Sequence, residues 1–295
     1  MAASLADVLL LMHGADLRFG SVRMVVREWS HYERLQRAWS RDEGGTSLAG
    51  AGATVYAAGE PGEPAPEEGT ERTRVWWLKP DHVRLEHDDG DGGTRIEVAA
   101  GGRWWSWAPE WGATSNDEEP DGGSGVQQPP FPQLLQPELL VSALRLELVG
   151  SGLQAGRRAI ALRGRPRRRG DHLEMLMPLA RGADAHDLMV DAERGILLRI
   201  ASEIDGEPFA ITEVEEVAFD EAFGPETFAL ELPPGETFQP PGGPPTVDVT
   251  LDEAARRAPF TVLAPPRIPR GAEVWVSLVE ASERPPLATH VHIAY

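Results

Sequence analysis

The stretch 101-GGRWWSWAPEWG-112 places four of the chain's nine tryptophans within eight consecutive residues. Another adjacent pair lies shortly before it, in 72-RTRVWWLKPDHVRLE-86. Successive side chains of a strand point to opposite faces, so Trp105 and Trp107 share one face and Trp104 lies on the other. Tryptophans on both faces predict a sheet with its core on one side and a helix, a loop or a ligand on the other.

The composition is that of an acidic globular protein. The 295 residues are 41% hydrophobic and 25% charged, which is enough apolar material for a substantial core. A formal net charge of −19 argues against nucleic acid as a partner and against general adsorption to anionic membranes. Because cysteine is absent, disulfides, thiolate metal sites and cysteine nucleophiles are excluded.

The N-terminus shows no targeting segment. The apolar run at residues 8–12 is too short for the hydrophobic part of a signal peptide, and no run approaches the ~18 apolar residues of a membrane span. We expect instead a short amphipathic helix with Leu5, Val8, Leu9 and Met12 on one face. This predicts a cytoplasmic protein, or an extracytoplasmic one if the start site is mis-assigned.

Most of the chain has strand character. Alternating or apolar runs predict strands at residues 20–30, 72–86 (with a bend at Lys79-Pro80), 94–100, 103–109, 157–165, 172–179, 186–191, 195–204 and 208–219. Helices are expected after the capping box of Ser30 and Glu33 and over residues 137–148. Residues 42–71 and 110–136 are expected to be loops.

The chain divides near a segment rich in proline and glycine. We assign a main domain to residues 1–235, a linker to 236–249 and a small C-terminal module to 250–295. The module is predicted to hold a helix at 251–258 and strands at 272–280 and 287–295. Some fifty residues are too few for a confident independent core, so we expect the module to dock on the main domain.

A series of short motifs follows in order along residues 5–235. They are the bend Lys79-Pro80 with Arg84, Gly101 before Trp105, Trp107 and Pro109, then Asp191 with Gly195, and Phe228 before Pro233. Each alone is a common strand or turn signature, but together they resemble the LolA-like superfamily of bacterial lipoprotein carriers, which includes sigma-factor regulatory relatives. Residues 250–271 resemble a small module that often follows such domains.

The resemblance implies an α+β fold that is mainly β. It would be an open, curved antiparallel half-barrel with helices covering the concave face, plus a small α/β appendage. In that superfamily the space between sheet and helices holds acyl chains or other apolar ligands. We therefore predict a cavity wall formed by Trp77, Trp105, Trp107, Val75, Met24 and Val26. The alternative for the tryptophans is ordinary core packing.

The predicted function is non-enzymatic binding of a lipid or another hydrophobic molecule. This chain lacks a lipobox cysteine, so lipoprotein delivery is not implied. The alternative is a protein-interaction module that regulates a partner, with only a residual cavity. No nucleophile elbow, phosphate-binding loop, zinc-protease motif or dinucleotide fingerprint occurs, so we predict neither catalytic residues nor a cofactor.

Two polar features remain. A run without acidic residues carries seven arginines: Arg157, Arg158, Arg163, Arg165, Arg167, Arg168 and Arg169. It is either a solvated hairpin or a docking patch for an acidic protein partner or a lipid head group. His290 and His292 share one face of a predicted strand, but two ligands without a third predict no metal site.

Docking of the C-terminal module can be tested by limited proteolysis. Apolar residues such as Phe260, Val262 and Trp275 are expected to be buried against the main domain, because they are too many to leave in water. We therefore expect slow cleavage within residues 238–245. Rapid cleavage that releases a folded fragment and leaves the main domain unaltered would contradict docking.

Overall fold

The structure is a computed structural model of the chain. It describes residues 4–42, 67–88, 93–109, 112–116, 126, 129–141, 143–167, 182–239, 246–258, 275–279, 282–283, 286–287 and 290–294.

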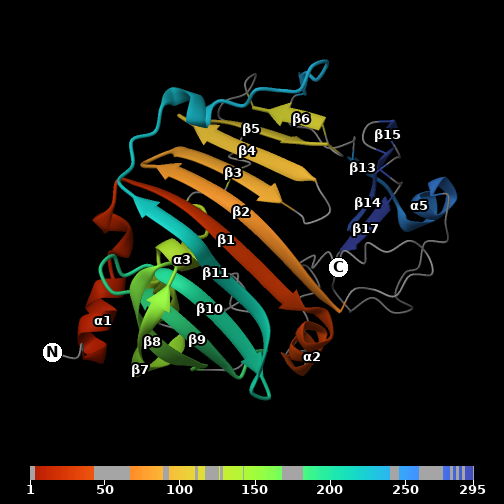
Figure 1. The fold of residues 1–295 in the computed structure, drawn as a ribbon. Helices are drawn as coiled ribbons and strands as arrows, with labels where there is room; N and C mark the ends of the chain where they lie inside the picture. Colours follow the sequence, from red (N-terminus) through yellow and green to blue (C-terminus); the bar gives the residue numbers. More distant parts are fainter. Residues whose placement is uncertain are drawn as a thin grey trace.

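A single large sheet organises these residues (Figure 1). Its twelve strands lie in the order β12-β6-β5-β4-β3-β2-β1-β11-β10-β9-β8-β7. The strands are β1 (Ser21–His31), β2 (Glu68–Leu78), β3 (His82–Asp88), β4 (Thr94–Ala100), β5 (Arg103–Ala108), β6 (Gly112–Ser115), β7 (Leu144–Gln154), β8 (Arg157–Pro166), β9 (Ala185–Asp191), β10 (Leu197–Ile204), β11 (Glu207–Phe219) and β12 (Phe238–Gln239). All neighbours are antiparallel except β12, which runs parallel to β6.

The strand order shows how the sheet is built. Strands β1 to β6 form one antiparallel meander, and β7 to β11 form a second. The pairing of β1 with β11 joins the two meanders, from Val22 opposite Phe219 to Ser30 opposite Ala210. A register shift between Val25 and Val26 marks a bulge in this ladder, which increases the local twist. The predicted mainly-β, open antiparallel sheet is therefore confirmed.

Few helices accompany the sheet. They are α1 (Leu5–Met12), α2 (Tyr32–Asp42), α3 (Pro132–Leu135) and α4 (Glu138–Val141), with 3-10 turns at Ala15–Arg18 and Pro225–Phe228. Helix α1 begins with a capping box, in which Ser4 and Asp7 exchange side-chain and backbone hydrogen bonds. Helices α3 and α4 have four residues each, too few for a helix to be stable without tertiary packing.

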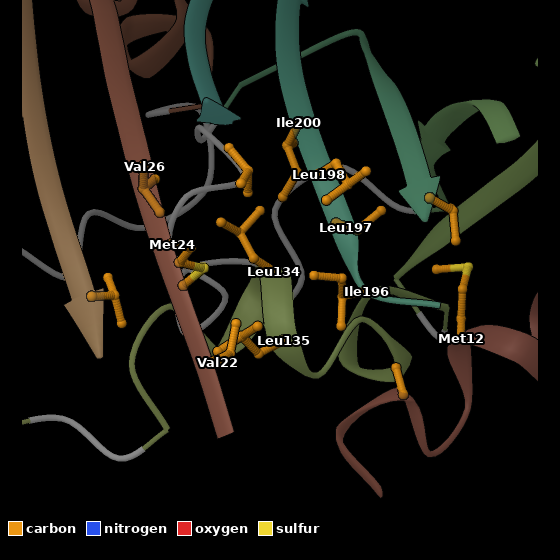
Figure 2. Close-up of a cluster of buried hydrophobic side chains, with 14 of the residues drawn as sticks. Met12, Val22, Met24, Val26, Leu134, Leu135, Ile196, Leu197, Leu198 and Ile200 are labelled. Carbon is orange, nitrogen blue, oxygen red and sulfur yellow. The ribbon is translucent and has the colours of Figure 1, made fainter. Parts of the chain in front are cut away.

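The core lies between the helices and one face of the sheet. Val22, Met24 and Val26 of β1 point to this face, and each is at most 1% exposed. We call it the inner face, and the opposite one the outer face. Figure 2 shows Leu134 and Leu135 of α3 lying against these β1 residues and against Ile196, Leu197, Leu198 and Ile200.

Ion pairs cover much of the outer face. Arg27 of β1 binds Glu213 and Glu215 of β11, and Arg72 of β2 also binds Glu215. Further along, residues 220–239 leave β11 and cross beside β3 and β4, where Arg84 donates to two backbone carbonyls of this segment. The segment ends in β12 at the far edge of the sheet (Figure 1).

The C-terminal part forms separate small elements. Strands β13 (Thr246–Asp248), β14 (Trp275–Val279) and β17 (His290–Ala294) make a three-stranded sheet, and β15 (Ser282–Glu283) pairs with β16 (Pro286–Leu287). Helix α5 (Leu251–Arg257) matches the helix predicted over residues 251–258, and the hydroxyl of its N-cap residue Thr250 accepts a hydrogen bond from the Glu253 N–H. Docking on the main domain stays a prediction.

Several boundaries differ from the sequence predictions. The helix expected over residues 137–148 is only α4, and strand β7 begins at Leu144, because pairing with β8 satisfies the backbone there. Strand β6 and helix α3 lie within the expected loop 110–136, and β2 begins at Glu68, before the expected end of loop 42–71. The predicted strand 172–179 lies outside the described residues.

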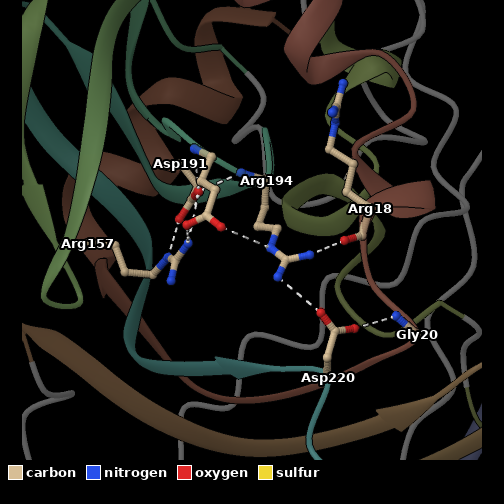
Figure 3. A network of polar contacts seen from close by, with 7 residues as sticks. Arg18, Gly20, Arg157, Asp191, Arg194 and Asp220 are labelled. Atoms are coloured by element: carbon tan, nitrogen blue, oxygen red, sulfur yellow. Dashed lines mark hydrogen bonds and ion pairs between the residues drawn. The ribbon is translucent and has the colours of Figure 1, made fainter.

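A buried carboxylate ties the β9–β10 turn to the rest of the fold (Figure 3). Asp191 is fully buried and accepts hydrogen bonds from the Arg157 side chain and from the backbone N–H groups of Glu193 and Arg194. Arg194 in turn pairs with Asp220, whose carboxylate accepts from the Gly20 backbone. Burial alone would raise the pKa of Asp191, but these hydrogen bonds outweigh it and the net shift is downward.

We expect Asp191→Ala to lower the free energy of unfolding by about 3–5 kcal/mol, because it leaves Arg157 without its buried partner. A matched control is Glu193→Ala: the Glu193 side chain is 71% exposed, so losing its ion pair with Arg157 should cost less than about 1 kcal/mol. Urea unfolding of the two variants and the wild type at neutral pH measures both losses.

The Asp191 contribution also has a defined pH dependence. Because the pKa is lower in the folded protein, the stabilisation is present above the unfolded value of about 3.9 and is lost as the pH falls through the folded value. The difference between wild type and Asp191→Ala should therefore shrink only in acid. A difference that stays constant down to full protonation would contradict this assignment.

Candidate functional site

The strand register decides which side chains share the inner face. Directly opposite residues of antiparallel strands lie on the same face. Across β1 and β2, Val22 is opposite Trp77, Met24 is opposite Val75 and Val26 is opposite Thr73. Four of the six predicted wall residues, Trp77, Val75, Met24 and Val26, therefore lie together on the inner face.

These four residues belong to the packed core. Each is at most 5% exposed, and all are members of one buried cluster with Leu134 and Leu135 of α3. Trp77 meets the Phe19 ring edge-on, with 5.8 Å between ring centroids. The space between sheet and helix is thus occupied by side chains of a four-residue helix.

The other two predicted wall residues lie on the opposite face. In the β4–β5 ladder, Ala99 of the inner face is opposite Trp104, whereas Trp105 is opposite Val98 and Trp107 is opposite Ile96. The expectation that Trp105 and Trp107 share a wall with Trp77 is therefore wrong. Trp104 takes that place, and it packs partly buried against the core cluster.

The inner face changes from apolar to polar along the strands. The row through Val26 continues across the sheet as Thr73 and His87, and the row through Val75 continues as Leu85, Glu97 and Ser106. Glu28 lies beyond Val26 on the same face of β1, opposite Thr212. We call Glu28, Thr73, His87, Glu97 and Ser106 the polar end of the inner face.

Buried nitrogens of three inner-face residues, Trp77, His87 and His186, have no hydrogen-bond partner among the described residues. The His87 Nδ1 atom lies 3.0 Å from the Thr73 hydroxyl, but its Nε2 atom is buried and unpartnered. The Trp77 indole Nε1 is likewise buried without a partner. Leaving a buried polar group unsatisfied costs about 1–3 kcal/mol, so each nitrogen gains if a polar group reaches it.

Burial disfavours the charged forms of the titratable groups at the polar end. It lowers the pKa of His87 to about 4, with a smaller contribution from Arg95, so the imidazole is uncharged at pH 7. Burial also raises the pKa of Glu28, helped by the neighbouring Glu71 charge. It raises the pKa of Glu97 against the opposing effect of Arg95, whose guanidinium lies 2.6 Å from the Glu97 carboxylate. These groups suit hydrogen bonding to a neutral molecule better than capture of an ion.

The predicted arginine patch is divided. Arg157 binds Asp191 and Glu193, and Arg163 binds Asp187 and Glu203, so both are neutralised within the fold. Arg167 donates its Nε–H to the Leu144 carbonyl. Of the remaining members, Arg158 and Arg165 are exposed, while Arg168 and Arg169 lie outside the described residues.

A pocket lies on the outer face, where residues 220–239 cross the sheet. It has a volume of about 450 Å³ and is lined by Trp76, Arg84, Glu226, Thr227, Ala229 and Glu231. Its wall is mostly polar, and Arg84 already donates to the Thr227 and Ala229 carbonyls. This pocket does not suit an apolar ligand.

The described residues were compared with the requirements of a metal site and of a membrane-spanning helix. Within them, no group of three or more histidines, aspartates or glutamates is arranged to hold a metal ion. His290 and His292 both belong to β17, but their side chains lie outside the described part of the chain. No helix among the described residues has the length and apolar composition needed to cross a membrane.

The polar end is not recognisable from the residues of any single strand. Thr73 lies between Arg72 and Arg74, and His87 lies between Glu86 and Asp88. Glu97 alternates with apolar neighbours, so each of the three residues is typical of a solvated segment when its strand is taken alone. Only the pairing of four strands places them beside Val26 and Val75. A signal was present in the apolar runs Val22-x-Met24-x-Val26 and Val75-x-Trp77, which mark the buried face to which polar neighbours could have been aligned.

The chain is similar in structure to several solved proteins, all at low sequence identity. No family model matches the sequence, and no curated protein matches it. The structure is similar to the Pseudomonas aeruginosa MucA/MucB complex structure, with 16% identity, a TM-score of 0.42 and coverage of 94% of this chain and 76% of the other. It is also similar to the Mycobacterium tuberculosis lipoprotein LppX, with 13% identity, a TM-score of 0.40 and coverage of 75% and 99%.

A LolA superfamily protein from Nitrosomonas europaea is similar with 9% identity, a TM-score of 0.28 and coverage of 78% of this chain and 99% of the other. The solved structures to which this chain is similar thus include a member of the superfamily that the sequence resembles. Because these TM-scores lie below 0.5, the function proposed below rests on the residues of this chain alone.

Replacing Trp77 on the inner face and replacing Trp107 on the outer face should lower the free energy of unfolding by different amounts. Trp77→Ala should lower the free energy of unfolding by about 3–5 kcal/mol, because it opens a cavity in the packed inner face. Trp107→Ala should cost less, because Trp107 is only half-buried on the outer face. Urea unfolding of the two variants checks this, and an equal or larger loss for Trp107→Ala would contradict the face assignment.

Proposed function

We propose that this chain is a non-enzymatic binding protein for an amphipathic lipid-like molecule. Its apolar chain would lie along the inner face of β1 to β3. Its neutral polar head would lie at the polar end. The observation that carries the proposal is the buried inner face itself, on which apolar residues lead to the unpartnered His87 Nε2.

The cover of this face is suited to displacement. Helices α3 and α4 have four residues each, so few helical hydrogen bonds are lost when they move. Leu134 and Leu135 are held mainly by apolar contacts with β1 and with residues 196–200. An acyl chain offers Met24, Val26 and Val75 the same apolar contacts, so it can replace the leucines without exposing the sheet to water.

The chemistry of the polar end favours a neutral head group. The uncharged imidazole of His87 and the Thr73 hydroxyl can donate to or accept from a hydroxyl or an ester carbonyl. The raised pKa values of Glu28 and Glu97 show that negative charge is disfavoured there. A second negative charge from a carboxylate head would add to this cost.

The proposal is tested with a fluorescent monoacylglycerol and the fatty acid of the same chain length. We expect saturable binding of both at pH 7, with the monoacylglycerol bound more tightly. The double variant Leu134→Ala/Leu135→Ala should bind about tenfold more tightly, or ~1.4 kcal/mol, because less protein must be displaced by the ligand.

The matched control is Ile204→Ala, in the separate buried cluster of Ala38, Ile204 and Phe209. It should lose stability in the same way as the leucine variant but leave the dissociation constant unchanged. Absence of saturable binding to both wild type and the leucine variant would rule out an inner-face site. A fatty acid preferred over the monoacylglycerol would contradict the neutral head group.

A further inference from the structure

Strand β7 is an edge strand of the large sheet in the part of the chain that the structure describes. It ends the strand order, and within the described residues it pairs only with β8. Its eleven residues include neither proline nor lysine, which commonly protect exposed edges. Among the described residues, one side of its backbone is therefore a row of N–H and C=O groups without a strand partner.

The edge strand also exposes apolar side chains. Leu148 is 41% exposed, Val149 66% and Leu153 72%. The register shift after Leu148 makes Val149 a bulge, while Leu153 is opposite Arg158 of β8. Exposed apolar residues along an unpaired edge are a feature of strand-addition sites, where pockets or patches read alternate side chains of the incoming segment.

Three arginines flank this edge without a partner. Arg145 of β7 is directly opposite Arg165 of β8, and Arg158 lies at the other end of the ladder. None of the three side chains forms a hydrogen bond or an ion pair with any part of the chain that the structure describes. The neighbouring Arg157 and Arg163 of β8 are each bound by two carboxylates.

This free positive charge is out of keeping with the rest of the molecule. The chain has a formal net charge of −19, so acidic groups to neutralise the three arginines are abundant in its composition. Glu147 is the only acidic residue of β7. Like charges that face each other across a ladder, as Arg145 and Arg165 do, are destabilising unless an anion bridges them.

We propose that β7 is a docking edge for an acidic, extended segment of another protein, which adds to the sheet as a further strand. The β7 backbone would pair with the segment, Leu148, Val149 and Leu153 would contact its apolar residues, and Arg145, Arg158 and Arg165 would bind its carboxylates. This site is separate from the inner-face site and does not depend on it.

Charge argues against a second copy of this chain as the occupant. Antiparallel pairing of two β7 strands would bring together two edges that both carry unpaired arginines and a single acid. Such pairing places like charges near one another, which opposes association. An acidic segment instead neutralises them.

The test uses a fluorescent peptide of about ten residues that alternates Glu and Val, the length of a long strand. The matched control peptide alternates Lys and Val. We expect the full chain to bind the acidic peptide, seen by fluorescence anisotropy, and not the basic one. Hydrogen exchange of the β7 amides should slow in the complex, because they gain partners.

The charge contribution is tested with the triple variant Arg145→Gln/Arg158→Gln/Arg165→Gln. It should bind the acidic peptide about tenfold more weakly, the sum expected for three exposed ion pairs. The control replaces three exposed arginines elsewhere, Arg37, Arg74 and Arg256, with Gln and should bind as wild type.

Several outcomes would overturn the proposal. They are failure of wild type to bind the acidic peptide, binding without β7 protection, and equal binding by the triple variant. Concentration-dependent dimerisation of wild type with β7 protection would assign the edge to a second copy. Self-association of the triple variant, with no peptide binding by wild type, would show that the arginines only keep the edge from pairing.

Discussion

The ladder between β1 and β11 is the interaction on which the rest of the structure depends. It joins residues about two hundred positions apart, from Val22 opposite Phe219 to Ser30 opposite Ala210. Each meander on its own would leave a long edge unpaired and one face of its core open to water. Their union makes one continuous inner face, which α3 and α4 then cover. Loss of this ladder would therefore remove the inner-face site together with the fold.

The same ladder explains how charge is distributed. On the outer face it brings Arg27 against Glu213 and Glu215, and the network continues to Arg72 and Arg199. Because both strands are central, these pairs are partly shielded from water and compensate one another. Toward the free edge this compensation stops: Arg163 is still bound by two carboxylates, whereas Arg165, two residues further along β8, has no partner among the described residues. Among the described residues, unbalanced charge therefore appears near the edge of the sheet where β7 has no further strand partner.

The inner face has two features that are unusual for a simple core. A core is most stable when its polar atoms are all satisfied, yet Trp77 Nε1 and His87 Nε2 are buried without partners. The cover over the apolar part consists of two very short helices. Unsatisfied atoms beneath an easily displaced cover are typical of a site that completes its contacts with a ligand. The proposed docking edge on β7 lies in the other meander, so the two sites can act independently.

The sequence by itself determined the class of fold and the relative orientation of neighbouring side chains. The alternation in 103-RWWSWAP-109 correctly separated Trp104 from Trp105 and Trp107, because side chains of a strand have a period of two. The absolute face was decided only by pairing: Ala99 opposite Trp104 places Trp104 inward, and a register one residue away would reverse all three. For the same reason, the polar end and the unpaired arginines could not be found from single strands. The extent of β7 was likewise set by its ladder with β8, since the leucines at 144, 146 and 148 fit a strand only when a neighbouring strand satisfies their backbone.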